Sequence, residues 1–165
     1  MMISKPSVST GPAARPERVS HRAAARVICV DPAGRILLIR WHDTVDDVTF
    51  WEPPGGGLEA GETSLQAARR ELWEETGLPQ SAVTGQNVVV YRRFRWLGTS
   101  YERHEPFFVA RFAVPRPPVV PARLTTEEHG RLIGHAWFSS EELATFAEPV
   151  EPPDLRSILQ SLGIH

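Results

Sequence analysis

The chain has 165 residues, 41% of them hydrophobic and 23% charged, and its formal net charge is −2. These values are typical of one globular domain with its own core. The small net charge gives no electrostatic basis for binding nucleic acid or a membrane surface, so we expect neither partner. A single cysteine, Cys29, excludes a disulfide framework and a cysteine-based zinc site. The single cysteine and the lack of an apolar signal-peptide segment favour a cytoplasmic protein.

The N-terminal segment is polar and contains three prolines within its first twenty residues. We therefore predict a flexible tail over residues 1–20 and a single domain over residues 21–165. Basic residues mark the junction, and a solvated charged surface is the simplest interpretation of Arg15, Arg18, Arg22 and Arg26.

The start of the domain predicts a β-hairpin. The apolar segments "AARVICV" (24–30) and "RILLIRW" (35–41) are strand candidates, and the turn sequence "DPAG" (31–34) separates them. A polar loop over 42–49 should follow and lead into the glycine-rich segment "FWEPPGGG" (50–57).

A helix is predicted over residues 63–77. Thr63 can cap its start, with Gln66 three residues later completing a capping box, and Gly77 can end it. One side of this helix carries an apolar stripe formed by Leu65, Ala68 and Leu72.

The second half of the chain alternates strand and helix signals. We predict strands over 87–98, 105–114 and 134–138, an extended proline-rich connector over 115–122, and helices starting near 139 and 153. Strands interleaved with two or three helices indicate a mixed sheet covered by helices, in the α/β or α+β class.

The predicted helix carries three carboxylates, Glu71, Glu74 and Glu75, within one arc of its surface. Two such charges about 6 Å apart repel by about 3 kcal/mol at an effective dielectric constant near 20. An acidic face that is merely solvated, with Arg69 and Arg70 offsetting some charge, is the ordinary explanation. A calcium loop is excluded, because its alternating oxygen ligands and central glycine are absent.

The spacing around these glutamates is more specific than an acidic helix. The chain contains Gly56, five residues, Glu62, seven residues, Arg70-Glu71-Leu72, one residue, Glu74-Glu75, one residue and Gly77-Leu78. This pattern resembles, at every position, the box that defines the Nudix hydrolases. The resemblance implies a Nudix fold, which is a mixed β-sheet sandwiched between helices (α/β/α).

The same resemblance implies a pyrophosphohydrolase that uses Mg²⁺ or Mn²⁺ to cleave a nucleoside diphosphate linked to another group. Divalent ions would neutralise the anionic linkage and acidify the attacking water. Carboxylates are the hard oxygen ligands that Mg²⁺ prefers. Without an ion, one or more of these crowded carboxyl groups should have a raised pKa.

Residue roles follow from matching the box. The resemblance implies metal binding by Glu71, Glu74, Glu75 and the carbonyl of Gly55, with Glu62 as an accessory ligand or supporting carboxylate. Structural roles are implied for three residues of the box: Gly56 allows a tight backbone turn beside the metals, Arg70 holds a glutamate in place, and Gly77 ends the helix.

The general base comes either from the box or from a later loop. Glu74 and Glu75 are the candidates within the box. Of the loop pair Glu127 and Glu128 we favour Glu128, and a helix-capping or solvated role is an equal alternative for that pair. Glu102 and Glu105 rank behind them.

Several residues outside the box are candidates for substrate binding. Arg40 ends a strand and could hold a terminal phosphate, with an exposed strand-end charge as an equal alternative. Trp41, Phe94 and Trp96 could stack on a base, although a core role is the first interpretation for each of these aromatic residues. The resemblance implies a small-molecule nucleotide as the partner.

The substrate is chosen by elimination. Phe94 stands where the ADP-ribose pyrophosphatases tend to carry a proline, and the NADH and coenzyme A signatures are absent. This leaves hydrolysis of a nucleoside or deoxynucleoside triphosphate to monophosphate and pyrophosphate. Cleavage of ADP-ribose, another nucleotide sugar or a dinucleoside polyphosphate remains an alternative, as does a non-catalytic nucleotide-binding regulator. The sequence leaves monomer and homodimer equally open.

Overall fold

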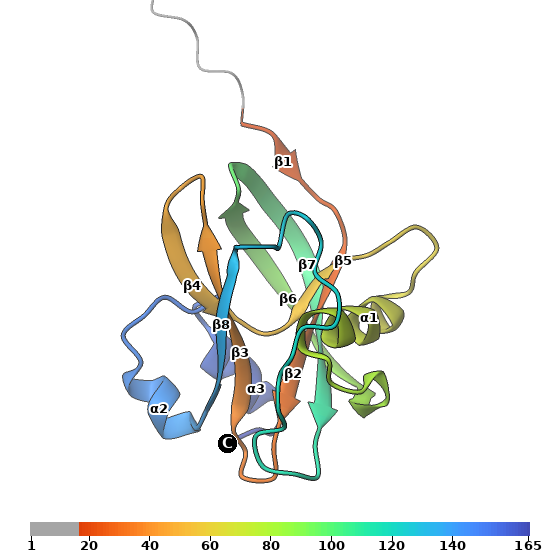
Figure 1. The fold of residues 1–165 in the computed structure, drawn as a ribbon, viewed down its shortest axis with the longest axis vertical. Helices are drawn as coiled ribbons and strands as arrows, with labels where there is room; N and C mark the ends of the chain where they lie inside the picture. The colour runs from red at the N-terminus through yellow and green to blue at the C-terminus, as the bar shows by residue number, and fades with distance from the viewer. Residues whose placement is uncertain (1–16) are drawn as a thin grey trace, which may run out of the picture.

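The computed structural model describes residues 17–165 and shows a mixed β-sheet with helices on both faces (Figure 1). Two parallel pairings, β1 with β7 and β7 with β2, join antiparallel ones in an eight-stranded sheet. The strands are β1 (Val19–Ser20), β2 (Ala24–Val30), β3 (Ile36–Asp43), β4 (Val48–Glu52), β5 (Gly55–Gly57), β6 (Val83–Trp96), β7 (Thr99–Arg111) and β8 (Leu132–Phe138). The helices are α1 (Ser64–Thr76), the 3-10 turn η1 (Gln80–Ala82), α2 (Ser140–Thr145) and α3 (Leu155–Ser161).

The hydrophobic core has two halves, one on each face of the sheet. Val27 and Cys29 of β2 face α1 and belong to a cluster with Leu72. Their neighbour Ile28 points to the opposite face and lies in a second cluster with α2 and α3, which includes Leu159. This alternation is the period of a strand that is buried on both faces. The α/β/α sandwich implied by the sequence is therefore confirmed.

Helix α1 has the ends that the sequence predicts. The Thr63 side chain accepts from the Gln66 N–H and the Gln66 side chain accepts from the Thr63 N–H, which completes the capping box. Gly77 adopts a left-handed conformation (φ 69°), and its N–H donates to the Trp73 carbonyl. A Cβ at Gly77 would lie 2.4 Å from the Val120 carbonyl oxygen, so space and conformation both require glycine there.

The long β6–β7 hairpin contains most of the two strands predicted over 87–98 and 105–114, but both strands begin and end earlier than predicted. Its register runs from Val83 opposite Ala110 to Trp96 opposite Thr99. Leu97 and Gly98 both have positive φ at the tip, as in the type I′ turns that suit hairpins. The predicted connector over 115–122 carries no strand, in agreement with its proline content.

The polar loop predicted over 42–49 is wrong in part, because β3 and β4 continue into it as a hairpin. Asp43 supplies the reason. Its buried carboxylate accepts from the N–H groups of Val45, Asp46 and Leu97, which satisfies the turn and joins it to the tip of β6–β7. The polar segment predicted as a loop is therefore a turn between two strands, and the side chain of Asp43 fixes it.

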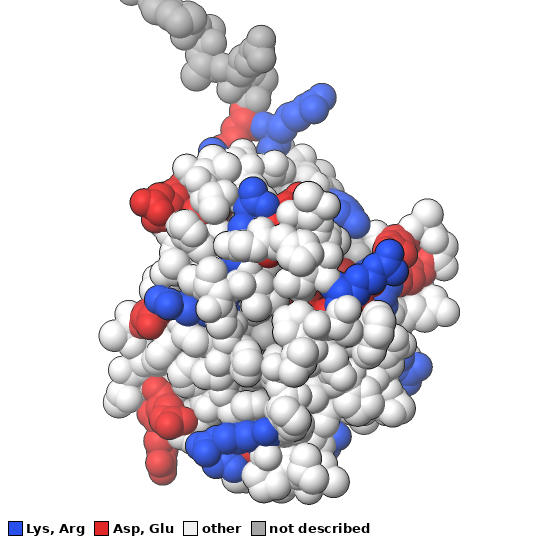
Figure 2. Space-filling model, viewed as in Figure 1, with Lys and Arg blue, Asp and Glu red and all other residues white. Residues whose placement is uncertain are grey.

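The basic junction also differs from its prediction. Most of the predicted tail, including Arg15, lies outside the described residues, whereas Val19 and Ser20 form β1 beside β7. Arg26 is only 5% exposed, so a solvated role is wrong for this residue. On the face shown in Figure 2, acidic and basic side chains lie in small groups among uncharged residues, and in several of these groups the two signs lie side by side. None of the described helices is long and apolar enough to cross a membrane.

Candidate active site

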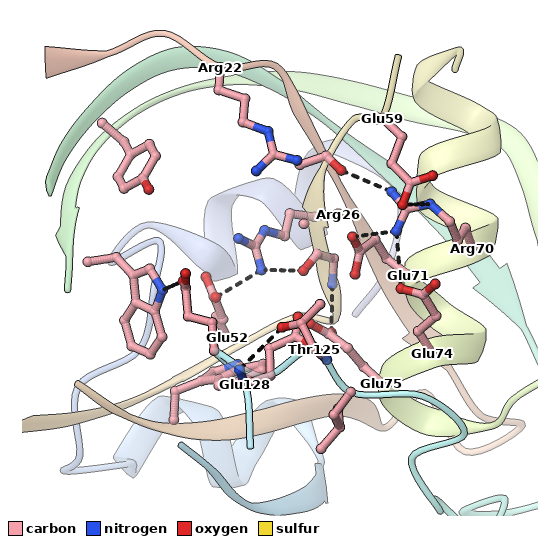
Figure 3. Close-up of a pocket in the computed structure, with 18 of the residues that line it drawn as sticks. Arg22, Arg26, Glu52, Glu59, Arg70, Glu71, Glu74, Glu75, Thr125 and Glu128 are labelled. Atoms are coloured by element: carbon pink, nitrogen blue, oxygen red, sulfur yellow. Dashed lines mark hydrogen bonds and ion pairs between the residues drawn. The ribbon is translucent and has the colours of Figure 1, made fainter. Parts of the chain in front are cut away.

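A cavity of about 520 Å³ lies between α1, the glycines of β5, the β6–β7 hairpin and the loop over 123–128 (Figure 3). One end is lined by carboxylates and arginines, and the other by aromatic side chains. Its volume is within the usual range for small-molecule sites.

Three glutamates meet at the charged end of the cavity. Glu71 and Glu75, one turn apart on α1, approach Glu128 from the loop, and one carboxylate oxygen of each lies within 4.8 Å of the other two. We call Glu71, Glu75 and Glu128 the carboxylate cluster. The loop fixes Glu128 locally, because the Thr125 N–H donates to its Oε2 at 2.7 Å. The sequence analysis named all three as candidates, Glu71 and Glu75 as metal ligands and Glu128 as the general base, and the fold brings them together from segments about fifty residues apart.

The charged forms of Glu71 and Glu75 are disfavoured in the carboxylate cluster. Burial raises the pKa of Glu71, although the nearby Arg70 partly opposes the effect. Burial and the adjacent Glu71 raise the pKa of Glu75 well above its ordinary value, against a smaller opposing effect of Arg26. The raised pKa values expected from the sequence are therefore confirmed, and a cation would relieve the repulsion.

The donor set fits a divalent ion. All three groups offer hard carboxylate oxygens, which Mg²⁺ and Mn²⁺ prefer. Oxygens at adjacent positions of one octahedral Mg²⁺, each bound at about 2.1 Å, lie about 3 Å apart, so the three carboxylates would close on an ion from their separation of up to 4.8 Å. Glu71 and Glu75 are therefore the residues that would hold the ion, with Glu128 facing them from the loop.

Arg70 organises the remaining acids of the box. Its Nε donates to Glu62 at 2.6 Å, and its Nη1 donates to Glu71 at 2.8 Å and Glu74 at 3.1 Å. Its Nη2 also donates to the Gly57 carbonyl at 2.9 Å. Glu62 and Glu74, which the resemblance implies as ligands, are thus paired with Arg70 and lie outside the carboxylate cluster. Both remain predictions as metal ligands.

The glycines of β5 bring the backbone against these carboxylates. Gly55 has a φ of 152°, its N–H donates to Glu75 Oε2 at 3.0 Å, and its carbonyl accepts from Arg26 at 3.2 Å. A Cβ on Gly56 would lie 2.6 Å from Glu71 Oε1. A side chain at either position would therefore displace a glutamate of the carboxylate cluster or the backbone that holds it.

The aromatic end contains most of the predicted substrate residues. Trp41, Phe94 and Trp96 line it together with Phe50 and Tyr101. The rings of Trp41 and Trp96 meet edge to face with centroids 5.9 Å apart, and Phe94 stacks on Tyr101 at 5.1 Å. The indole N–H of Trp96 donates to Glu127 Oε1 at 3.2 Å, which links the aromatic wall to the loop of Glu128.

Arg40 does not line this cavity. Its guanidinium lies over the Trp51 ring and pairs with Glu148 at 3.1 Å, on the face of the sheet covered by α2 and α3. Consecutive strand residues point to opposite faces, so the orientation that brings Trp41 into the cavity takes Arg40 away from it. The prediction that Arg40 binds substrate is corrected on this ground.

A buried set of ion pairs beneath the cavity was not predicted as a unit. Arg26 pairs with Glu52 and Glu105, both at 2.8 Å, and Arg92 contacts the same two carboxylates at 3.4 and 3.2 Å. Arg103 lies 3.5 Å from Glu105. We call these five residues the arginine network. These five residues come from four strands, β2, β4, β6 and β7, and the clearest signal in the sequence was the charge of Arg26 inside the apolar segment AARVICV.

Glu105 was one of the lower-ranked candidates for the general base. Despite its burial, the pKa of Glu105 falls to about 2, chiefly because of the charges of Arg26, Arg92 and Arg103. A carboxylate held so firmly in its charged form is a weak proton acceptor. The arginine network is therefore suited to support the site.

Comparison with known proteins assigns the family. The NUDIX domain model matches residues 20–162. The chain thus belongs to the Nudix hydrolases and is an enzyme that acts on phosphoanhydride bonds. Phosphatase NudJ of Escherichia coli strain K12 is 34% identical over 119 residues, covering 71% of this chain and 69% of that protein.

Solved structures show the same fold at low identity. The MutT protein of Methanosarcina mazei Go1 is 16% identical with a TM-score of 0.58, over 91% of this chain and 96% of that one. An Ap4A hydrolase of C. elegans is 17% identical with a TM-score of 0.58, over 86% and 95%. A Francisella tularensis bifunctional NMN adenylyltransferase/ADP ribose pyrophosphatase, complexed with AMP and a manganese ion, is 21% identical with a TM-score of 0.59, over 86% and 42%.

Proposed function

We propose that this Nudix pyrophosphohydrolase cleaves a nucleoside or deoxynucleoside triphosphate to its monophosphate and pyrophosphate. One observation carries the proposal: a single cavity has the carboxylate cluster at one end and flat aromatic walls at the other. Such a cavity suits a ligand with an anionic chain attached to a heterocyclic ring. The manganese ion in the Francisella relative supports the use of Mg²⁺ or Mn²⁺ here.

The residues of the cavity then have distinct tasks. Glu71 and Glu75 would hold the divalent ion, and Arg70 fixes Glu71 by a hydrogen bond. When bound, the ion would neutralise the phosphate oxygens and lower the pKa of the attacking water. Trp96 and Phe94 would stack on the base and so orient the phosphate chain towards the carboxylates.

Glu128 is our candidate for the general base. The Thr125 N–H occupies only Oε2 at 2.7 Å, so Oε1 remains for a water molecule in the cavity. The Glu128→Gln variant should lose about 10²- to 10³-fold in kcat, the usual effect of removing a general base. The neighbouring Glu127→Gln variant is the matched control and should change kcat by less than about 10-fold. Equal losses in the two variants would reject Glu128 as the base.

The substrate class is tested with a nucleotide panel and product analysis. Wild-type protein with Mg²⁺ should release pyrophosphate from a triphosphate, and EDTA should abolish the reaction. Release of AMP and a sugar phosphate from ADP-ribose as the fastest reaction would replace the triphosphate proposal. Tight nucleotide binding without any hydrolysis would instead contradict the proposed reaction and favour a regulator.

A further inference from the structure

Arg26 is a buried charge that touches two different parts of the site. On one side its Nε and Nη1 pair with Glu105 and Glu52, both at 2.8 Å. On the other side Nη1 donates to the carbonyls of Pro53 at 3.3 Å and Gly55 at 3.2 Å. A single guanidinium therefore joins the arginine network to the glycine strand β5.

Gly55 carries this connection onward to the carboxylate cluster. The peptide of Gly55 lies against β2, since a Cβ there would be 2.3 Å from the Ala25 carbonyl oxygen and 2.7 Å from Arg26 Cδ. Its N–H donates to Glu75 Oε2 at 3.0 Å. In this short chain of contacts, Arg26 binds the carbonyl of Gly55 and Glu75 accepts from the amide of Gly55.

We propose that Arg26 is a positioning residue for Glu75. By holding the Gly55 carbonyl, it fixes residue Gly55 on the side opposite its N–H, which lies in the preceding peptide group and orients the Glu75 carboxylate towards Glu71 and Glu128. The backbone bond from the Val27 N–H to the Pro54 carbonyl, at 2.8 Å, holds that preceding peptide group. The effect of Arg26 on catalysis rests on the proposed function, in which Glu75 holds the ion. The structural part of the proposal, the order of the Gly55 peptide, is independent of any substrate or metal.

The arginine network explains why Arg26 can act as a rigid support. Glu105 comes from β7 and is completely buried, with Arg92 and Arg103 as further partners. Glu52 lies at the end of β4. Arg26 is thus held by two carboxylates from two strands, and a guanidinium fixed on both sides retains little rotamer freedom. Strands of the sheet therefore set the position of Gly55, whose N–H reaches Glu75 of α1.

Arg92 provides a matched control within the same network. It contacts Glu52 and Glu105, as Arg26 does, and also Glu151 at 3.4 Å. Among the described residues it makes no hydrogen bond to the Gly55 peptide. Arg26→Met and Arg92→Met therefore both remove a positive charge from Glu52 and Glu105, but only the first also removes the contacts with Pro53 and Gly55 and a charge that acts on Glu75.

The structural part is tested by amide hydrogen exchange, followed by NMR on the metal-free protein. In Arg26→Met, the Gly55 amide should exchange at least about 10-fold faster relative to the slowest core amides. In Arg92→Met, that ratio should stay within about 2-fold of wild type. An unchanged ratio in Arg26→Met, or an equal rise in both variants, would overturn the proposal. If Arg26→Met does not fold, Arg26→Lys, which keeps the charge and loses the forked donors, is subject to the same criterion.

The functional part is tested by Mn²⁺ titration, measured by electron paramagnetic resonance. Arg26→Met should bind Mn²⁺ at least about 10-fold more weakly than Arg92→Met, with the stability of both variants measured in parallel. Equal affinity in the two variants would refute positioning of Glu75 by Arg26. A wild-type protein that hydrolyses no nucleotide would contradict the proposed function, while the exchange result would still decide the role of Arg26.

Discussion

Two groups of buried glutamates lie on either side of Gly55 and behave in opposite ways. In the carboxylate cluster, burial raises the pKa of Glu71 and Glu75. In the arginine network, Glu105 is at least as buried, yet its pKa falls to about 2 because three guanidinium groups surround it. Burial alone therefore does not distinguish a structural carboxylate from a metal-binding one. The distinction lies in whether the protein supplies the countercharge itself or leaves it to a ligand.

The largest expected effect comes from neutralising the carboxylate cluster. Glu75→Gln should lower kcat/KM by at least about 10³-fold, since it removes an ion ligand that contributes about 4 kcal/mol to transition-state stabilisation. The free energy of unfolding of the metal-free protein should stay the same or rise, because a buried charge of raised pKa is replaced by a neutral acceptor for the Gly55 N–H. Steady-state kinetics and urea unfolding measure the two quantities.

The exposed Glu141→Gln on α2 is the control for this variant and should leave both quantities unchanged. Full activity of Glu75→Gln would contradict the assignment of the carboxylate cluster. A marked loss of stability without loss of activity would place Glu75 with the structural carboxylates instead.

The same substitution in the arginine network should have the opposite result. Glu105→Gln leaves Arg26, Arg92 and Arg103 with less countercharge in a buried place, so we expect a loss of about 3 kcal/mol or more in the free energy of unfolding. Urea unfolding at pH 7 measures this loss. A Glu105→Gln protein as stable as wild type would show that the arginines find other partners.

The features that sequence predicted well are local ones. The capping box of Thr63 and Gln66, the terminating Gly77 and the spacing of the glutamates all lie within one helix and its ends. The arginine network was missed because its members meet only in three dimensions: Arg26 and Glu105 are 79 residues apart. The prediction for Arg40 failed for a different reason. The sequence places Arg40 near the end of a strand, but it does not tell to which face of the sheet the side chain points.

The free energy of unfolding of the protein should also depend on pH through Glu105. Glu105 has a pKa of about 2 in the folded protein, below its ordinary value of 4.5, so its stabilising contribution is fully present above pH 4.5. That contribution is lost as the pH falls towards 2, and it amounts to up to about 3 kcal/mol at about 1.4 kcal/mol per pKa unit. The difference in unfolding free energy between wild type and Glu105→Gln should therefore shrink from pH 6 to pH 3. A difference that stays constant over this range would contradict the low pKa.

The smallest expected effects separate the two neighbours Trp41 and Arg40, which point to opposite faces of the sheet. Trp41→Leu should raise KM for the nucleotide about 10-fold, because Trp41 packs edge to face against Trp96, whose stacking on the base would contribute about 1–3 kcal/mol. Arg40→Met should change KM by less than about 2-fold, because its guanidinium is held by Glu148 and Trp51 outside the cavity. Initial-rate measurements at saturating Mg²⁺ test both variants. A larger KM effect from Arg40 than from Trp41 would mean that the phosphate chain reaches beyond the cavity described by Glu71, Trp96 and their neighbours, and that the substrate is longer than a triphosphate.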